Sequence, residues 1–492
     1  MANGIQIGPS GSPDIDGVLW GWCWQANQPN FHTLLTFSFP TSTAAYLGYT
    51  AVNGFEAFND KQLAAASKIL AMYDNVCNVD FILSADPAAG NIRLAEMTSI
   101  DVGTGPHAFP TAYGIAPDPN NAPAFAHGDA WFNHKYYNNP VLGSFAFAAG
   151  LMHEIGHTLG LKHGHMAQDV QNASGAYVYT NPSLPANHDS FEYSVMTYRG
   201  YPGASIKHGI TAKEFPSTPM QDDIAALQYL YGANFDYNSG NTVYTFSSKT
   251  GAMSIDGVSQ GATFHHKIFL TVWDGGGNDT YDLSNYKTNE VIDLNPGAWS
   301  TPSKAQRADL DLFHPGHHMA RGCIANALLL YGDPHGYIEN AIGGSGNDKI
   351  YGNAVSNALL GGGGNDKIHG GDSADALVGG RGRDIIYGDA GADDFIFTAA
   401  SQSGSGAKHH DSVMDFNGLE GDLIDLSGFD ANSRAAGLQH FDFIDIQAFD
   451  HTAGELRFAN HLLQGDVNGD GKADFEVYLS TVLLFSFDLK LE

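Results

Sequence analysis

A nine-residue repeat constrains the fold of this chain more than any other feature of its sequence. From Gly343 onward the chain reads GGSGNDKIY, GNAVSNALL, GGGGNDKIH, GGDSADALV, GGRGRDIIY and GDAGADDFI, six units without an insertion. Glycine at the first positions permits the left-handed backbone of a tight turn, the sixth position carries a carboxylate or an amide, and the eighth is large and apolar. A flexible linker would have no reason to keep that eighth position apolar. The pattern predicts a parallel β-roll that binds calcium.

The period of the repeat also predicts which acids lie together. Two nonapeptides form one coil of the roll, so residues 18 positions apart stack on the same edge. Calcium takes roughly six to eight oxygen ligands, which carboxylates and turn carbonyls of successive loops can supply. We expect Asp348, Asp366 and Asp384 on one edge, Asn357, Asp375 and Asp393 on the other, and carbonyl ligands from Gly343, Gly346, Gly361 and Gly364. The amide of Asn357 makes the second edge the weaker one.

A histidine-rich stretch indicates the chemistry of the first half. The segment LMHEIGHTLGLKHGH holds four histidines and one glutamate. A helix from Ser144 to Leu159 would place His153 and His157 one turn apart on a single face, as two imidazole ligands of one zinc ion require. Glu154 would lie beside the metal, placed to take a proton from zinc-bound water. The remaining histidines follow no ligand spacing, and we expect surface or hydrogen-bonding roles for them; they include His127, His134, His165, His188, His265, His266, His409 and His410.

The full pattern is H-E-x-x-H-x-x-G-x-x-H. Gly160 would end the helix in a left-handed conformation, and the chain would return so that His163 becomes the third ligand. Metzincin proteases require a second element, a Met-turn below the zinc, and SVMTY (Ser194 to Tyr198) fits it. Three neutral imidazoles leave an open position for a water molecule whose pKa falls towards about 7. Glu154 would accept its proton during attack on a peptide carbonyl and return it to the leaving amine. An extended substrate could lie along PHAFPTAY, residues 106 to 113.

Composition excludes several partners. The 23 Lys and Arg residues face 53 Asp and Glu residues, so the net charge of -30 argues against nucleic acid and anionic membranes. No apolar run is long enough to span a membrane, and the N-terminus shows no secretory signal. The three cysteines form no C-x-x-C pair, so any metal must use histidine and carboxylate. We expect a monomer that acts on proteins or peptides.

The change in glycine content near Gly232 predicts two domains. Before it, Phe58 to Val79 and Asp222 to Gly232 have helical spacing, and NIRLAEM reads as a strand. After it, the segments TVYTF, HKIFLTVWD and FEVYLSTVLLFSFDL read as strands. We therefore expect an α+β metzincin protease domain over residues 1–235. An all-β parallel β-roll with a β-sandwich-like C-terminal region would occupy residues 236–492.

Taken together, these motifs resemble the serralysins, bacterial metzincins that join a zinc protease domain to a calcium-binding β-roll. NGIQI, LLTFSFP, DDIAALQYLYGAN, TVWDGGGNDTYDLS and GDLIDLSGFD carry the resemblance beyond the zinc helix and the repeats. It implies that Tyr198 is a further zinc ligand in the resting enzyme and later stabilises the oxyanion. It also implies a calcium ion at the domain junction, held by Gly240, Thr242, Asp274, Gly276 and Asp279. Asn238 and Asn241 replace the arginine and aspartate that the family commonly has near that site.

The resemblance further implies an extracellular protease of broad specificity. Serralysins leave the cell through a type I secretion machinery that reads a C-terminal segment, and a small periplasmic protein inhibits some of them. Calcium is scarce inside cells, so its binding can drive folding after export. The end of this chain, FSFDLKLE, departs from the acidic-apolar terminus of the family. The segment DVNGDGKAD (Asp466 to Asp474) resembles part of an EF-hand loop and is a further candidate calcium site.

Two alternatives remain open at this point. A calcium-binding adhesin could keep the roll without catalysis, although every residue that the chemistry needs is present. A lipase could use Ser259 of GVSQG, but the following ATFHHKIFLTVW reads as a strand where a nucleophile elbow needs a helix. We interpret Ser259 as a turn residue. No function is assigned to the cysteines or to the tryptophan-rich LWGWCWQ (Leu19 to Gln25).

Overall fold

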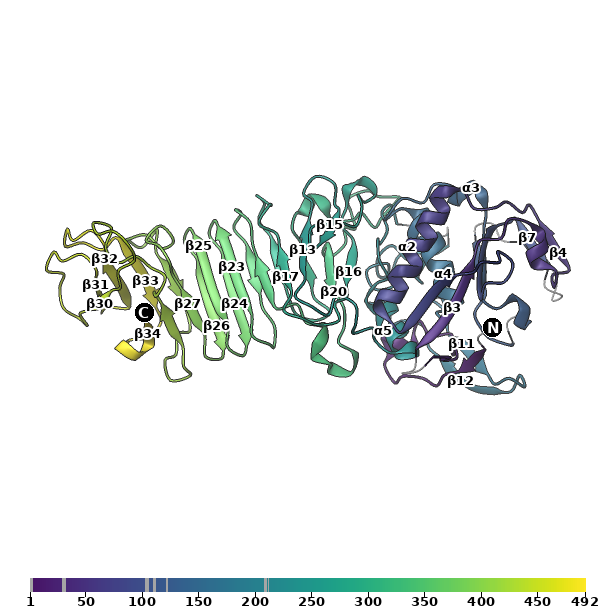
Figure 1. The fold of residues 1–492 in the computed structure, drawn as a ribbon, viewed down its shortest axis with the longest axis horizontal. Coiled ribbons are helices and arrows are strands. Elements are labelled where there is room, and N and C mark those ends of the chain that lie inside the picture. Colours follow the sequence, from purple (N-terminus) through teal and green to yellow (C-terminus); the bar gives the residue numbers. More distant parts are fainter. Residues whose placement is uncertain are drawn as a thin grey trace.

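The computed structural model describes residues 3–28, 32–101, 106–108, 112–120, 123–207, 210 and 212–492. Figure 1 shows an elongated molecule, with helices packed around a sheet at the N-terminal end and a long stack of strands towards the C-terminus. None of the helices within these described ranges is long and apolar enough to cross a membrane.

A five-stranded sheet organises the N-terminal part. Its strand order is β5-β3-β6-β10-β9, and only the edge strand β9 runs antiparallel to its neighbour. The strands are β3 (Thr33–Ser38), β5 (Val79–Leu83), β6 (Ile92–Glu96), β9 (Ala112–Gly114) and β10 (Asp129–Phe132). The expected strand NIRLAEM is β6. Of the segment expected to hold substrate, residues 112–113 lie in the edge strand, whereas residues 109–111 lie outside the described residues.

Helix α2 (Asp60–Val76) confirms the helix expected from Phe58 to Val79, with shorter ends. A capping box between Asn59 and Gln62 starts it, and the backbone becomes extended at Cys77 to enter β5. Its apolar face is buried in the hydrophobic core of the N-terminal part, called the first core below. The second expected helix is α5 (Gln221–Tyr231), which ends where Gly232 takes a positive φ of 83°.

The helix expected over Ser144–Leu159 consists of two segments. A π-helical segment, η4 (Ala146–Met152), leads directly into α4 (His153–Thr158). The whole of η4 is buried, and its small residues allow close packing: a Cβ on Gly150 would lie 2.2 Å from the ring of Tyr137. The prediction of one regular α-helix was therefore wrong for the first half of the segment.

The remaining N-terminal elements are short. They are β1 (Gly4–Gln6), α1 (Pro13–Asp16), β2 (Trp22–Trp24), η2 (Thr43–Tyr46), β4 (Ala51–Asn53), β7 (Ser99–Asp101), β8 (Pro106–Ala108), η3 (Ala124–Ala126), α3 (His134–Tyr137), β11 (Gln168–Gln171) and β12 (Tyr177–Asn181).

From β13 onward the chain builds two facing sheets of ten and nine strands, seen as the stacked arrows of Figure 1. The repeats form β22 (Lys349–Tyr351), β23 (Ala358–Gly363), β24 (Lys367–Asp372), β25 (Ala376–Arg381), β26 (Ile385–Ala390) and β27 (Asp394–Ile396). Ile350 pairs with Ile368 and Ile368 with Ile386, a step of 18 residues as the repeat predicts. The eighth-position side chains are buried between the sheets. They fill a second hydrophobic core, which lies between the two sheets, because alternate residues of each strand point inwards.

Other strands extend both sheets, except that β16, β20 and β19 form a separate three-stranded sheet. Before the repeats lie β13 (Val243–Phe246), β14 (Met253–Ile255), β15 (Val258–Ser259), η5 (Phe264–His266), β16 (Leu270–Val272), β17 (Thr280–Asp282), β18 (Val291–Asp293), β19 (Trp299–Ser300), η6 (Lys304–Gln306), β20 (Ile324–Asn326), η7 (Leu330–Gly332), η8 (Pro334–Gly336) and β21 (Asn340–Ile342). After them lie β28 (Asp411–Val413), β29 (Leu423–Asp425), β30 (Asp442–Phe443), β31 (Glu455–Ala459), β32 (Leu462–Asp466), β33 (Phe475–Leu479), η9 (Ser486–Asp488) and β34 (Leu489–Lys490). The sandwich-like C-terminal region is thus continuous with the roll.

Ser259 lies in a short exposed hairpin. It ends β15, where it pairs with Ser254 of β14. The segment after it contains one turn of 3-10 helix and then β16, so the helix of a nucleophile elbow is absent here. The interpretation of Ser259 as a turn residue needs only the small correction that it belongs to a hairpin strand.

Candidate metal centre and its surroundings

Three imidazoles of the zinc motif converge on one point. The Nε2 atom of His163 lies 3.1 Å from that of His157 and 3.1 Å from that of His153. Within the described part of the chain, this trio is the one group of three or more His, Cys, Asp or Glu side chains whose ligand atoms all lie within 4.8 Å of one another. His153 and His157 come from α4, one turn apart. Gly160, at φ 100°, reverses the chain and brings His163 to them.

The two helical imidazoles are fixed by their second nitrogens. Nδ1 of His153 lies 2.8 Å from the carbonyl oxygen of Val195, and Nδ1 of His157 lies 2.8 Å from that of Leu161. Both carbonyls accept a hydrogen bond, so each Nδ1 carries the proton and each Nε2 presents a lone pair. Burial lowers the pKa of His153 to about 3 and of His157 to about 4, and also lowers that of His163. The trio is therefore neutral near pH 7, as a zinc site requires.

Glu154 lies in helix α4, where this helix meets the edge strand β9. The backbone N–H of Gly114 in β9 donates to its carboxylate, and burial raises the pKa of Glu154 to about 8. A Cβ on Gly114 would lie 2.4 Å from the carbonyl oxygen of Glu154, so only glycine allows this approach of strand to helix. The carboxyl group faces the cavity that also contains His157 and His163. The carboxyl group of Glu154 and the edge strand β9 thus line one cavity.

The Met-turn lies directly beneath the imidazoles. The hydroxyl group of Tyr198 lies 3.1 Å from Nε2 of His163, and burial raises its pKa to about 12. Met196 is fully buried in the first core. The turn is held by Asp223, which accepts hydrogen bonds from the Ser194 hydroxyl at 2.6 Å and the Val195 N–H at 2.8 Å.

Sequence reasoning missed Asp223 as a supporting residue. It lies in the first turn of α5, 27 residues after Met196, and is completely buried. Its carboxylate also accepts the N–H of Met220 at 2.9 Å. An acid in the first turn of an otherwise buried helix, DDIAALQ, was the available signal, because such an acid needs buried N–H donors.

The two acid rows of the roll lie as the repeat predicts. The N–H of Asp348 donates to Asp366 at 2.8 Å, and the N–H of Asp366 donates to Asp384 at 2.8 Å. On the other edge, the N–H of Asn357 donates to Asp375 at 2.7 Å, and that of Asp375 to Asp393 at 2.9 Å. Each bond joins residues 18 positions apart.

One oxygen of most of these carboxylates has no partner. The buried Oδ2 atoms of Asp366, Asp375 and Asp384 accept no hydrogen bond. Burial raises the pKa of Asp366 and Asp375 to about 7. For Asp384 and Asp393, the same cause raises the pKa to about 6. Buried oxygens without partners are costly unless a cation binds them, so this donor set fits calcium.

The expected glycine ligands flank these oxygens. A Cβ on Gly361 would lie 2.6 Å from Oδ2 of Asp366, and one on Gly343 would lie 3.1 Å from Oδ2 of Asp348. A Cβ on Gly364, at φ 121°, would lie 1.8 Å from the carbonyl oxygen of Gly346. The turns are packed so closely that side chains are excluded beside the carboxylates.

Both rows extend beyond the predicted residues. The N–H of Asp384 donates to Asp411 at 2.8 Å, and the N–H of Glu290 donates to Asp348 at 2.7 Å, so these two acids continue the first edge. Asp422 continues the second, since it accepts the N–H of Asp393 at 3.1 Å. These acids were missed because they lie outside the six units, where insertions interrupt the nine-residue spacing.

The junction residues also come together. The N–H of Thr242 donates to Asp279 at 2.7 Å, and the Tyr244 hydroxyl donates to Asp274 at 2.6 Å. Burial and the neighbouring Asp274 raise the pKa of Asp279 to about 8. Gly276 donates its N–H to Asp274 at 2.8 Å, and the hydroxyl of Thr242 donates to the carbonyl of Gly240 at 2.9 Å. Glu339 was missed: it accepts the N–H of Asp279 at 2.7 Å.

In the EF-hand-like segment, one acid organises the loop. Asp466 accepts the N–H of Gly469 at 2.6 Å and that of Gly471 at 2.7 Å. Asp474 accepts from the side chain of Asn468 at 2.7 Å. Calcium binding here stays a prediction.

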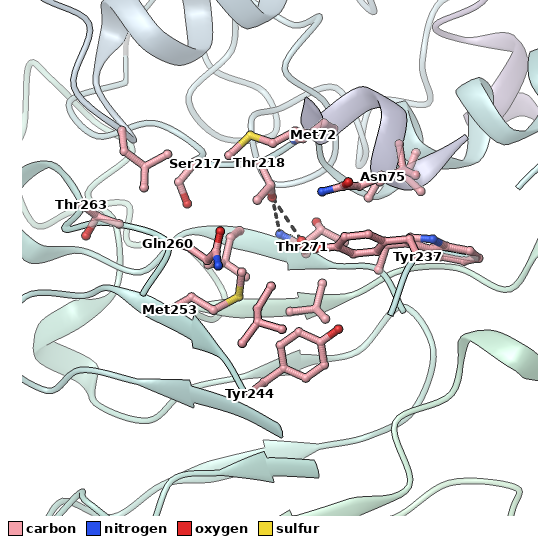
Figure 2. Close-up of a pocket in the computed structure, with 18 residues that line it drawn as sticks. Met72, Asn75, Ser217, Thr218, Tyr237, Tyr244, Met253, Gln260, Thr263 and Thr271 are labelled. Atoms are coloured by element: carbon pink, nitrogen blue, oxygen red, sulfur yellow. Dashed lines mark hydrogen bonds between the residues drawn. The ribbon is translucent and has the colours of Figure 1, made fainter. Parts of the chain in front are cut away.

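A different cavity lies between the N-terminal part and the roll, and Figure 2 shows its lining. Met72 of α2 faces Tyr244 and Met253 of β13 and β14 across it, and Thr218 bonds to Thr271. Its lining contains no histidine, cysteine or carboxylate among the described residues. This cavity therefore lacks the groups that hydrolysis needs.

Comparison with known proteins gives consistent results. The family model described as Peptidase M10 serralysin C terminal matches residues 233–303 and 334–482. Metallopeptidase AprA of Pseudomonas marginalis is 36% identical over 457 residues, covering 90% of this chain and 83% of that protein. Metalloprotease AprA of Pseudomonas entomophila is 33% identical, covering 93% and 85%. Serralysin of Proteus mirabilis is 32% identical, covering 66% and 60%.

Proposed function

Because this chain belongs to the serralysin family of metalloproteases, we propose that it is a secreted zinc endopeptidase that cleaves proteins with broad specificity and depends on calcium for its stability. The single observation that carries the zinc assignment is the convergence of three neutral imidazoles, with Nε2 of His163 3.1 Å from that of His157 and from that of His153, beside a cavity that Glu154 also lines. Three imidazoles with an adjacent carboxylate form the donor set of hydrolytic zinc sites.

His153, His157 and His163 would hold the zinc ion, which when bound lowers the pKa of a water molecule and polarises the scissile carbonyl. Glu154 takes the proton of the attacking water and returns it to the leaving amine. The Gly114 N–H keeps its carboxylate in place. Tyr198 is protonated because burial raises its pKa to about 12, so it can donate a hydrogen bond to the developing oxyanion. Before substrate binds, its hydroxyl oxygen would be a further ligand of the zinc ion.

The substrate lies extended beside β9. This strand is the edge of its sheet, so its outer backbone groups can pair with a peptide. Gly114 of this edge strand donates its N–H to the carboxylate of Glu154 and packs closely against the backbone of the same residue. These contacts support a substrate position across helix α4.

Calcium ions occupy the two edges of the roll and the junction. The unpartnered Oδ2 atoms of Asp366, Asp375 and Asp384 support this proposal, as does the buried, unpartnered Oδ2 of Asp279. We place the boundary between the protease domain and the roll-containing domain near residue 235. Export through a type I secretion machinery and inhibition by a small periplasmic protein belong to the same proposal.

Metal analysis of the native protein beside Glu154→Ala tests the catalytic assignment. We expect about one zinc per chain in both, and a loss of proteolysis of roughly 10²-fold or more in the variant, because a general base contributes that much. Casein digestion should also stop when a zinc chelator is added. If the native chain binds zinc but digests no protein, the adhesin alternative is correct. If Glu154→Ala keeps its activity, the assigned base is wrong.

A further inference from the structure

The tryptophan-rich segment supports the turn that carries the third imidazole. The N–H of Trp20 donates to the carbonyl of Gly160 at 2.9 Å, and the N–H of Lys162 donates to the carbonyl of Val18 at 2.7 Å. The indole N–H of Trp24 donates to the carbonyl of Thr158 at 2.7 Å, at the end of the zinc helix. This N-terminal segment is therefore part of the cleft architecture.

Trp20 differs from the other tryptophans of the segment because it faces the cleft. Trp22 and Trp24 are buried, whereas Trp20 is partly exposed and lines the cavity that contains the catalytic groups. Its indole ring meets the ring of His157 edge to face, with centroids 6.1 Å apart. Its indole N–H donates to the buried carboxylate of Asp118 at 2.9 Å. Two contacts thus fix the orientation of the ring.

The cavity around Trp20 has a volume of about 170 Å³, and most of its lining surface is apolar, which suits an apolar side chain. Tyr113 and Met166 add further apolar surface to its lining. The amino group of Lys162 is directed to backbone carbonyls, those of Met166 and Pro182 at 2.8 Å each and that of Gly17. Lys162 therefore offers no counter-charge to an acidic substrate residue. Glu154 is the one carboxylate among the described lining residues.

We propose that Trp20 is a specificity-determining residue that forms one wall of the substrate side-chain pocket beside His157, and that it favours a bulky apolar residue next to the scissile bond. This inference rests on the proposed endopeptidase function. A rigid indole that is fixed by Asp118 and His157 gives such a pocket a defined width, and an apolar pocket discriminates by the area that the substrate side chain buries in it.

Cleavage of a peptide library randomised on both sides of the scissile bond tests the proposal, with products identified by mass spectrometry. The native chain should enrich leucine, methionine or phenylalanine over alanine at one flanking position. In Trp20→Ala the ratio of kcat/KM between the leucine and alanine peptides should fall about tenfold. Trp20→Phe shortens the wall of the pocket, so the enzyme's preference should move towards substrate side chains with larger rings. This second variant keeps the test informative if Trp20→Ala does not fold.

Trp22→Phe is the matched control. It removes an indole N–H that donates to the Gln171 carbonyl at 3.2 Å, outside the cavity, and should leave the cleavage profile as it is. Zinc content and melting temperature of each variant separate a change of pocket from a loss of fold. Identical profiles for the native chain and both Trp20 variants would overturn the inference and leave the endopeptidase function standing. A native chain that cleaves no peptide would overturn both.

Discussion

The proposed zinc centre and the proposed calcium sites of the roll would bind a cation in opposite ways. In the zinc centre, the ligands are neutral, and hydrogen bonds to Val195 and Leu161 orient two of them without the metal. In the roll, the ligands are buried acids with unpartnered oxygens, and burial raises the pKa of Asp366 to about 7. The first site is organised without its ion, whereas we expect the second to be stabilised by calcium that compensates the charges of its acids.

The largest effect that we expect is the loss of stability of the roll when calcium is removed. Each calcium site at a thousandfold excess of the ion over its dissociation constant contributes about 4 kcal/mol, and several sites act together. An excess of a calcium chelator should therefore lower the melting temperature of the roll, measured by circular dichroism, more than any other change proposed here. Glu154→Ala is the material to use, because it avoids self-digestion. A circular-dichroism melting curve that is unchanged in chelator would contradict the proposal that calcium stabilises the roll.

A smaller effect is expected from Tyr198→Phe, which changes the zinc centre alone. Removal of one hydrogen bond to an oxyanion costs roughly 10²-fold in kcat. Zinc content should stay near one per chain, because the three imidazoles keep their orientation without Tyr198. The calcium dependence of melting should match that of the native chain. If kcat is unaffected, Tyr198 is a core tyrosine without a part in the reaction.

The smallest effect concerns pH, and its sign differs with and without calcium. In the calcium-free roll, Asp366, Asp375, Asp384 and Asp393 have folded pKa values of about 6 to 7, above their ordinary value of 3.8. Their contribution to stability is fully present below pH 4 and is lost as the pH rises through 6 to 7. Calcium binds the ionised acids, so its affinity rises over the same range.

The melting temperature of the calcium-free protein should therefore be lower at pH 8 than at pH 5. In saturating calcium we expect the reverse order. Thermal melts in chelator and in excess calcium at the two pH values make the comparison. Equal melting temperatures at both pH values in chelator would show that the pKa values of the buried acids are not raised in the calcium-free protein.

Much of this molecule was predictable because its key patterns are local or periodic. The spacing of His153, His157 and His163 within eleven residues indicated a metal site, and the nine-residue period placed Asp348 above Asp366. Helix α5 was predicted from its apolar spacing and Gly232. By contrast, the π-helical first half of the zinc helix left no signature in the spacing of its residues.

Residues that act over long sequence distances were not predictable. Asp223 supports a turn near Met196 from another helix, and Asp411 continues the acid row across an interrupted repeat. Trp20 reaches the cleft from the N-terminal segment, 137 positions before His157. No local pattern connects these partners, because their contacts exist only after the chain has packed.

The sequence by itself determined the class of each proposed metal site, since the type and spacing of donors follow from short segments with a regular backbone. Only the tertiary structure decided which acids complete the calcium rows, what holds the Met-turn, and which wall shapes the cleft. The physical reason is that burial and hydrogen-bond pairing depend on elements brought together from distant parts of the chain, whereas helix and repeat geometry depend on neighbours.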